Sequence, residues 1–282
     1  MKVSNKVLST TALAVAMALA SPLALAETSS YLIKNARIFD GQSEKLTKPK
    51  SVLVEGNKIT KISSSIKAPE GAEVIDAAGK TLSPGFIAVH EHMMSALSFG
   101  EIFTKDTRYK AYVATTTAET YLMNGFTSIR DVAGNTFSLK DAIDTGYIQG
   151  PRIYPSGPMI SQTSGHSDHR FQSDGNAMKG GTWDTMEREG DMLILDGVPE
   201  VLKGVREVLR QGASQIKIAV GGGTGSYADP LDTVQFTPAE IKAATDAAGD
   251  WNTYVTAHVY NSDGIRRAVD NGVKCIEHAN LI

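Results

Sequence analysis

The spacing of hydrophobic residues changes near residue 82. From Tyr31 to Leu82, short apolar runs are separated by turn residues, and Glu55-Gly56-Asn57 stands between two of these runs. This pattern predicts short strands, with a tight hairpin at the glycine. The expected strands are Tyr31–Ile33, Ala36–Phe39, Ser51–Val54, Lys58–Ile62 and Glu73–Asp76. We therefore predict a small β module over residues 27–82.

After Pro84, strand-like apolar runs alternate with longer helix-like stretches, a rhythm typical of parallel βα units. The expected strands are Phe86–His92, Thr127–Val132, Arg152–Ser156, Gln215–Val220, Tyr254–His258 and Val273–Glu277. The expected helices are Asp106–Asn124, Glu200–Gln211, one that starts at the capping box of Thr237 and Glu240, and Ser262–Asn271. About six such strands in succession indicate an incomplete (β/α)8 TIM barrel over residues 83–282. A doubly wound sheet is less favoured because no Gly-x-Gly-x-x-Gly opens the first helix.

One segment interrupts the alternation of predicted strands and helices. Ser161–Val198 is long and polar, and it follows the third predicted strand of the barrel. In a barrel it would emerge at the catalytic face, where loops determine specificity. His166 lies in this segment. It is predicted either to contact substrate or to belong to a solvated loop without a chemical role.

The first residues are typical of a secretory signal. A basic start precedes an apolar stretch, Val7–Ala20, which is too short to span a bilayer comfortably. An Ala-x-Ala site ends at Ala26. We expect residues 1–26 to be a signal peptide and the mature chain to be periplasmic or secreted, without stable membrane insertion. An uncleaved membrane anchor is the alternative.

Composition narrows the function classes. The chain of 282 residues carries 21% charged residues and a net charge of −3, without charge runs, which does not favour nucleic acid as a partner. Its length allows one large α/β domain with a small appendage. Cys275 is the only cysteine, so no internal disulfide can form. Its apolar surroundings favour a buried small hydrophobe over a catalytic thiol.

The strongest chemical signal is the pair His90 and His92. Residues i and i+2 of a strand point to the same face, so both imidazoles should aim at one point inside the barrel. Buried imidazole nitrogens need partners, and a shared cation would satisfy both. Two histidines satisfied within the core are the alternative reading.

Lys217 is the second signal. It shares a strand face with Gln215 and Ala219 and should point into the barrel lumen. A buried ammonium is unfavourable unless it loses its proton or gains a partner. Such a lysine could form a Schiff base with a carbonyl substrate, or react with carbon dioxide to give a carbamate that bridges two cations. It could also simply extend to the barrel rim.

His258 and His278 end the fifth and sixth predicted strands. Together with the first two histidines and Lys217, they should converge at the carboxyl ends of the strands. Neutral imidazoles and a carbamate oxygen suit first-row metals, and zinc is the default.

Several motifs together resemble the metal-dependent amidohydrolase superfamily, most of all the secreted dipeptidases of its imidazolonepropionase-like and Xaa-Pro dipeptidase group. They are Ser83-Pro84-Gly85-Phe86-Ile87, His90-x-His92, Gly125-Phe126-Thr127-Ser128-Ile129-Arg130-Asp131, Gly150-Pro151-Arg152-Ile153, Ile216-Lys217-Ile218 and Ile276-Glu277-His278. The resemblance covers nearly everything after the signal. It implies that residues 27–82 are the N-terminal part of a β-sandwich module.

The resemblance also implies a set of roles. His90 and His92 would hold the more buried of two divalent metals, and Lys217, as N6-carboxylysine, would bridge the pair. His258 and His278 would hold the second metal. A hydroxide between the metals would attack an amide carbonyl, so we expect an amidohydrolase or metallo-dipeptidase acting on small substrates such as dipeptides.

Two tyrosines are further candidates for binding substrate. Tyr260 would donate a hydrogen bond to a substrate carboxylate or else pack at the rim. Tyr227 follows the run Gly221–Gly225, which lacks the lysine and spacing of a phosphate-binding loop and is better read as a loop of the catalytic face. Homo-oligomerisation is left open.

Two departures from the family pattern affect these expectations. Ala88 stands where the family usually has an aspartate, so support for the first histidine must come from elsewhere. The base aspartate of the eighth strand is absent, because the sequence stops after the sixth predicted strand. We therefore expect a truncated fragment that is inactive by itself. A Schiff-base lyase that uses Lys217 and a non-catalytic binding module are the alternatives.

Overall fold

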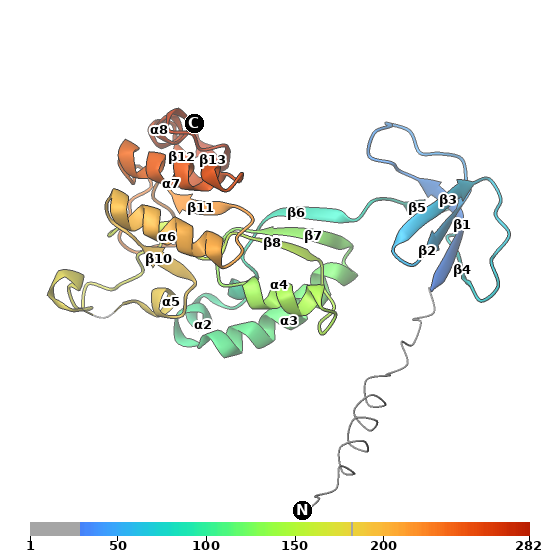
Figure 1. Ribbon diagram of the computed structural model, residues 1–282, viewed down its shortest axis with the longest axis horizontal. Helices are drawn as coiled ribbons and strands as arrows, with labels where there is room; N and C mark the ends of the chain where they lie inside the picture. The colour runs from blue at the N-terminus through green and yellow to red at the C-terminus, as the bar shows by residue number, and fades with distance from the viewer. Residues whose placement is uncertain (1–28, 182) are drawn as a thin grey trace, which may run out of the picture. The chain divides into compact units, whose positions relative to one another are not determined.

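The computed structural model describes residues 29–181 and 183–282, and its contacts divide the chain into two units between Pro84 and Gly85 (Figure 1). The predicted signal peptide, residues 1–26, lies outside the described residues. Within the described part of the chain, no helix is long and apolar enough to cross a membrane.

The first unit is a five-stranded sheet. Strand β1 pairs antiparallel with β2 and parallel with β4 and β5, and β2 continues into an antiparallel hairpin with β3. Gly56 closes that hairpin with φ of 61°, a conformation that glycine adopts without strain. The hairpin prediction is thereby confirmed. The strands are β1 (Ser30–Ile38), β2 (Lys50–Glu55), β3 (Lys58–Ser63), β4 (Glu73–Asp76) and β5 (Thr81–Leu82).

The second unit contains parallel strands in two sheets, ordered β6-β7-β8 and β10-β9-β11-β12-β13. These strands alternate with helices along the chain, which confirms the predicted parallel α/β architecture. The break between the sheets falls between β8 and β9, at Ser156, Gly157 and Pro158. The strands are β6 (Phe86–Glu91), β7 (Phe126–Asp131), β8 (Arg152–Pro155), β9 (Met159–Ser161), β10 (Met192–Ile194), β11 (Ile216–Ala219), β12 (Val255–Asn261) and β13 (Cys275–Leu281).

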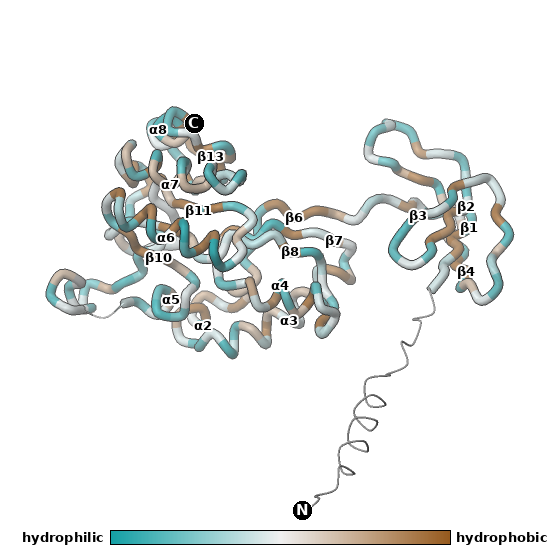
Figure 2. Tube along the Cα trace, viewed as in Figure 1, coloured by the Kyte–Doolittle hydropathy of each residue, from teal (hydrophilic) through white to brown (hydrophobic). Residues whose placement is uncertain are grey.

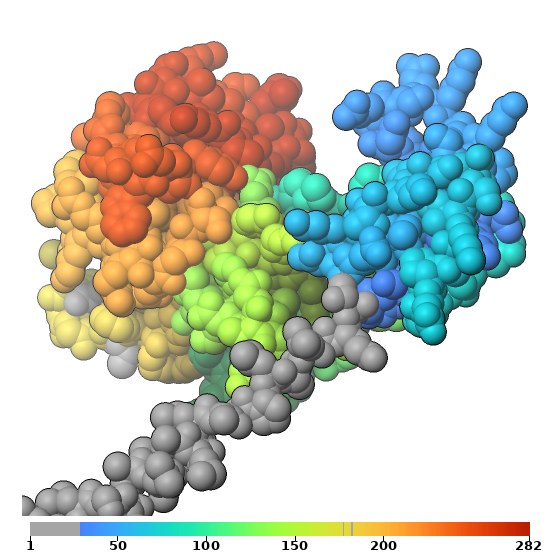
Figure 3. Space-filling view, turned by 45° about the vertical axis from the view of Figure 1, so that its right-hand side comes forward, coloured from blue at the N-terminus to red at the C-terminus, as the bar shows by residue number. Residues whose placement is uncertain are grey.

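Helices α6, α7 and α8 follow one another along the chain. The orange-to-red atoms of this C-terminal part of the chain gather on one side of the second unit in the space-filling view (Figure 3). Asp106 caps α3 by accepting the Tyr109 N–H, and a capping box with Pro238 in the first turn starts α7 as predicted. The helices are η1 (Met93–Ser95), α2 (Phe99–Thr104), α3 (Thr107–Met123), α4 (Phe137–Asp144), η2 (Ala177–Lys179), α5 (Thr185–Arg188), α6 (Val198–Arg210), α7 (Pro238–Asp250) and α8 (Ser262–Asp270).

The main core of the second unit lies between β11–β12 and helices α6 and α7. Ile216, Ile218, Val205 and Ala248 are almost completely buried there. Strand β6 is more exposed than this core, because it is the edge strand of its sheet. The hydrophobic colour runs along it in Figure 2, and its side chains Phe86, Ile87 and Val89 are 58–65% exposed.

The structure corrects the interpretation of one segment. The segment 161–198 is not a plain polar loop, because it ends β9 and contains β10 and the short α5. Strand β10 pairs in parallel with β9, so the insertion extends the sheet. Closure into a barrel and a sandwich in the first unit both stay predictions, since the described strands form two open sheets in one unit and a single sheet in the other.

Candidate functional site

Five histidine rings form a continuous chain of contacts in the second unit. The ring centroids of His92 and His90 are 5.1 Å apart, those of His90 and His278 are 4.8 Å apart, and those of His278 and His258 are 4.7 Å apart. The chain continues to His166, whose ring stacks on His258 at 3.8 Å. Three separate strand ends and one loop thus bring together all the histidines that the sequence singled out as candidates.

Local structure explains how the first pair is placed. β6 ends at Glu91, and η1 begins immediately after His92. The buried carboxylate of Asp131 accepts the Met93 N–H at 2.7 Å, which fixes the turn that follows His92. His92 therefore lies at the start of a turn, one residue beyond β6, whereas the predicted strand included it.

Lys217 lies within this group, on β11, with 1% of its surface exposed. Burial lowers the pKa of its amine to about 8, from an ordinary value of 10.5. The lysine acts in turn on its neighbours and contributes to the lowered pKa values of His92, His258 and His278. The prediction that it points inward agrees with this burial.

Three of these histidines, of which only His258 is fully buried, are neutral at physiological pH. Burial, followed by the charge of Lys217, lowers the pKa of His92 to about 3 and that of His278 to about 4. Burial and the neighbouring His166 lower the pKa of His258 to about 2. Neutral imidazoles keep one nitrogen lone pair, which is the form that ligates metals.

Two of these rings have a nitrogen available for a ligand. The Nδ1 atom of His92 is buried and has no hydrogen-bond partner among the described residues. The Nε2–H of His258 donates to the Gly222 carbonyl at 3.1 Å, which leaves the lone pair on Nδ1. A buried nitrogen without a partner is costly unless something else occupies it.

Glu277 is a carboxylate that the sequence analysis did not select. Its Oε2 accepts the Nδ1–H of His90 at 2.7 Å, and its Oε1 pairs with Arg130 at 2.6 Å and accepts a bond from Thr256. Burial by itself would raise the pKa of Glu277, but the hydrogen bonds from His90 and Thr256 outweigh burial and lower it. This carboxylate supplies the support for His90 that Ala88 cannot.

The backbone of β13 explains how Glu277 and His278 both reach the site. Adjacent residues of a regular strand point to opposite faces. Here His278 and Ala279 have φ of 76° and 52°, in the left-handed region that non-glycine residues rarely adopt. This local turn breaks the alternation, so that the His278 ring contacts His90 and His258 while Glu277 holds His90.

His166 is fixed by a second carboxylate that the sequence analysis missed. Its Nδ1 lies 2.9 Å from Ser226 Oγ and 3.2 Å from Asp229 Oδ2. A carboxylate only accepts hydrogen bonds, so Nδ1 carries the proton and Nε2 is left free. Gln235 accepts the backbone N–H of His166 at 2.9 Å. The serine and the aspartate contact the same nitrogen, so they do not form a nucleophilic triad with His166.

The two predicted tyrosines differ in position. Tyr260 lies against the histidines, with ring centroids 5.0 Å from His258 and 5.2 Å from His278. Tyr227 lies away from them, on the loop that follows β11, where it is 67% exposed and lines a separate aromatic pocket. Only the first is placed beside the histidine cluster.

The predicted binuclear metal arrangement is not assembled in the described residues. No group of three or more His, Cys, Asp or Glu side chains in them converges closely enough to hold a metal ion. The donor set itself still fits a metal, because His92 presents a buried nitrogen without a partner and Lys217 has a lowered pKa.

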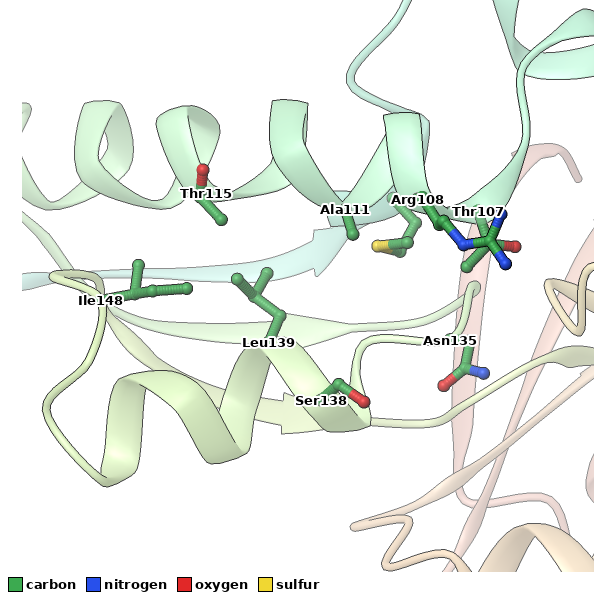
Figure 4. Close-up of a pocket in the computed structure, with 9 residues that line it drawn as sticks. Thr107, Arg108, Ala111, Thr115, Asn135, Ser138, Leu139 and Ile148 are labelled. Carbon is green, nitrogen blue, oxygen red and sulfur yellow. The ribbon is translucent and has the colours of Figure 1, made fainter.

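Another cleft of the second unit lies apart from these residues. It has a volume of about 260 Å³ and runs between α3 and α4, with Thr107, Ala111 and Thr115 on one side and Ser138 and Leu139 on the other (Figure 4). None of the histidines, nor Lys217, lines it. The candidate chemistry therefore belongs to the strand ends and not to this helical cleft.

The lowered pKa of Lys217 predicts a pH dependence of stability. Between pH 8 and 10.5 the unfolded chain binds a proton at this lysine that the folded chain has lost, so folding becomes more favourable as the pH rises. The gain should be about 3 kcal/mol across that window. Urea unfolding in metal-free, carbon-dioxide-free buffer measures it. Lys217→Met, which keeps the volume without the charge, should lack this increment, and an equal pH slope in both proteins would contradict the assignment.

Comparison with known proteins identifies the family. The profile of the amidohydrolase family matches residues 81–282. A curated relative, ochratoxinase from Aspergillus niger, is 38% identical over 165 residues, which cover 56% of this chain and 34% of the relative. The chain thus matches only about a third of that protein's length.

Two crystal structures give the same result. One is of a prolidase complexed with N-methylphosphonate-L-proline, with a TM-score of 0.81, 35% identity, and coverage of 90% of this chain and 62% of that one. The other is of a Xaa-Pro dipeptidase with bound methionine, with a TM-score of 0.74, 32% identity, and coverage of 89% and 61%. The predicted resemblance is confirmed: the family match takes in well over half of the sequence, and the chain belongs to the amidohydrolase family.

Proposed function

We propose that the protein carrying this chain is a metal-dependent hydrolase that cleaves amide bonds of small substrates, above all dipeptides. The observation that carries the proposal is a cluster of imidazoles, three of them with strongly lowered pKa values, around one buried lysine whose pKa is also lowered. Neutral imidazole nitrogens suit metal binding. The neighbouring lysine amine suits carboxylation.

The residues that would hold two divalent cations, zinc by default, are His90, His92, His258, His278 and Lys217 in its carboxylated form. Bound there, the metals would supply Lewis acidity toward water and toward a substrate carbonyl. The amine of Lys217 must be unprotonated to react with carbon dioxide, and its lowered pKa increases the fraction in that form near neutral pH.

Other residues of the chain would orient these groups. Glu277 accepts the Nδ1–H of His90 and so directs the free Nε2 of that ring inward. Asp229 accepts the Nδ1–H of His166, which leaves the lone pair on Nε2 to accept a hydrogen bond from a substrate. Tyr260 packs beside two of the rings and would bond a substrate carboxylate.

The relatives support a proposal for the substrate class. The matched structures include a prolidase with a proline phosphonate and a Xaa-Pro dipeptidase, and the curated relative is an ochratoxinase. We infer a small acyl amino acid, with Xaa-Pro dipeptides as the first choice. The pattern of residues 1–26 further suggests export, so that the enzyme would act on peptides in the periplasm or outside the cell.

Metal content tests the proposal. Elemental analysis of the purified protein should find about two divalent metals per chain, and Lys217→Ala should lower that number. A screen of Xaa-Pro dipeptides should then detect hydrolysis that a chelator abolishes and added zinc restores. Absence of metal, or a borohydride-trapped substrate adduct on Lys217, would contradict the hydrolase proposal and favour the Schiff-base alternative.

A further inference from the structure

A pocket lined by aromatic rings lies beside the histidine cluster. It has a volume of about 280 Å³. Its lining residues come from α2, from the 161–198 segment and from the loop after β11: Phe99, Phe103, His169, Phe171, Thr224, Gly225, Ser226 and Tyr227. Three of the four Phe and Tyr rings are largely exposed, at 66% for Phe99, 61% for Phe171 and 67% for Tyr227. Such a concentration of exposed rings indicates a surface that binds something apolar.

The rings are held in defined relative positions. Phe99 and Phe103 meet edge to face, with centroids 5.1 Å apart, and Phe103 meets His169 in the same way, also at 5.1 Å. Phe171 and Tyr227 are 6.3 Å apart, although they come from different loops. Edge-to-face contacts of this kind stabilise aromatic clusters beyond the area that they bury.

Ser226 connects this pocket to the histidine cluster. It lines the pocket and also lies 2.9 Å from Nδ1 of His166, whose ring stacks on His258. The loop that carries Ser226 encloses His166 closely, since a side-chain carbon at Gly223 would overlap the His166 ring. Ser226 and His166 therefore connect the wall of the pocket to His258, one of the candidate metal ligands.

The lining favours an uncharged group, and the volume of the pocket limits the size of that group. None of the pocket residues carries a carboxylate, an ammonium or a guanidinium group. Burial also lowers the pKa of the His169 ring, which disfavours its charged form. An apolar cavity of about 150 Å³ holds a benzene molecule, so a pocket of this size accommodates an aromatic side chain with its Cβ.

We propose that this pocket receives the side chain of the amino-terminal residue of the substrate and selects an aromatic or large aliphatic one. The inference rests on the proposed hydrolase function and adds the substrate class to it. Its physical basis is the burial of an apolar side chain among Phe99, Phe103, Phe171 and Tyr227, beside the residue that holds His166.

A pair of dipeptides tests the proposal. Phenylalanyl-proline and alanyl-proline differ only in the side chain that the pocket would receive. We expect kcat/KM to be about 10- to 100-fold higher for the first, as the burial of one large apolar side chain predicts. Phe171→Ala should bring the ratio of the two kcat/KM values close to one. Tyr112→Ala, which removes an exposed aromatic ring of α3 outside the pocket, should leave the ratio unchanged.

A binding measurement separates this proposal from the proposed function. Calorimetric titration of both dipeptides into Lys217→Ala should show the same preference without any hydrolysis, and the additional change Phe171→Ala should remove it. Preferential binding of phenylalanyl-proline to a protein that never hydrolyses it would overturn the hydrolase function and support the pocket. Hydrolysis or binding without a preference between the two dipeptides would overturn the pocket.

Discussion

Replacing Lys217 by alanine should lower the hydrolysis of Xaa-Pro dipeptides by at least ~10³-fold, the scale seen when a central member of a catalytic unit is removed. The buried amine is the group that would be carboxylated, and its charge already acts on three of the neighbouring histidines. No other lysine occurs in β11, so the sequence offers no direct replacement. Steady-state kinetics with zinc added back to both proteins measures the loss.

Two control variants test whether the loss of activity is specific to the amine of Lys217. Lys217→Met fills nearly the same volume without an amine, so it should lose activity equally while folding more stably than the alanine variant. Lys203→Ala, on α6 and away from the histidines, should retain full activity. If Lys217→Met kept a large part of the activity, neither a carbamate nor a Schiff base at this position could be part of the reaction.

Glu277→Ala should destabilise the second unit by about 3–5 kcal/mol, because removing one partner of a buried ion pair leaves the other charge uncompensated. Glu277 and Arg130 have side-chain exposures of 6% and 15%. The same carboxylate bonds His90 on β6 and Thr256 on β12, so the substitution also removes the side-chain link between β6 and β13. Urea unfolding followed by circular dichroism measures the change in free energy.

Glu207→Ala is the matched control. Glu207 also pairs with an arginine, Arg210, but both side chains are largely exposed on α6. An exposed pair contributes little, because water already solvates both charges. If the two alanine variants unfolded at the same urea concentration, the network around Glu277 would not stabilise the fold. Glu277→Gln, which keeps the shape of the side chain, then separates loss of charge from loss of packing.

The strand and helix rhythm of the second unit could be read from the sequence because its strands are buried and its helices carry clear ends. β11 is buried at every position, and α7 begins with a capping box and a proline. β9 and β10 could not be read, because each has only three residues, too few to show a period. β9 is also separated from β8 by Gly157 and Pro158, which indicate a turn in a sequence.

The site residues that lie at the ends of strands could be predicted from the sequence. The carboxyl ends of parallel strands lie at one edge of a sheet, so His90, His258 and His278 were expected together. The carboxylates that hold the rings were not predictable. Strand alternation would place Glu277 on the face opposite His278, and only the left-handed backbone of His278 removes that conflict. Asp229 is 63 positions from His166 in the sequence, and no spacing rule connects such a pair.

The left-handed turn in β13 also affects how the protein resists aggregation. β13 lies at the edge of its sheet in the described structure, and a long regular edge offers a row of N–H and C=O groups to a strand from another molecule. At His278 and Ala279 the backbone leaves the extended conformation, and the pairing register with β12 shifts after Val259. A strand from another molecule could therefore form backbone hydrogen bonds with only a few residues of β13 before the distorted backbone interrupts the pairing. The distortion that turns an imidazole toward the site also makes this edge a poor template for intermolecular sheet growth.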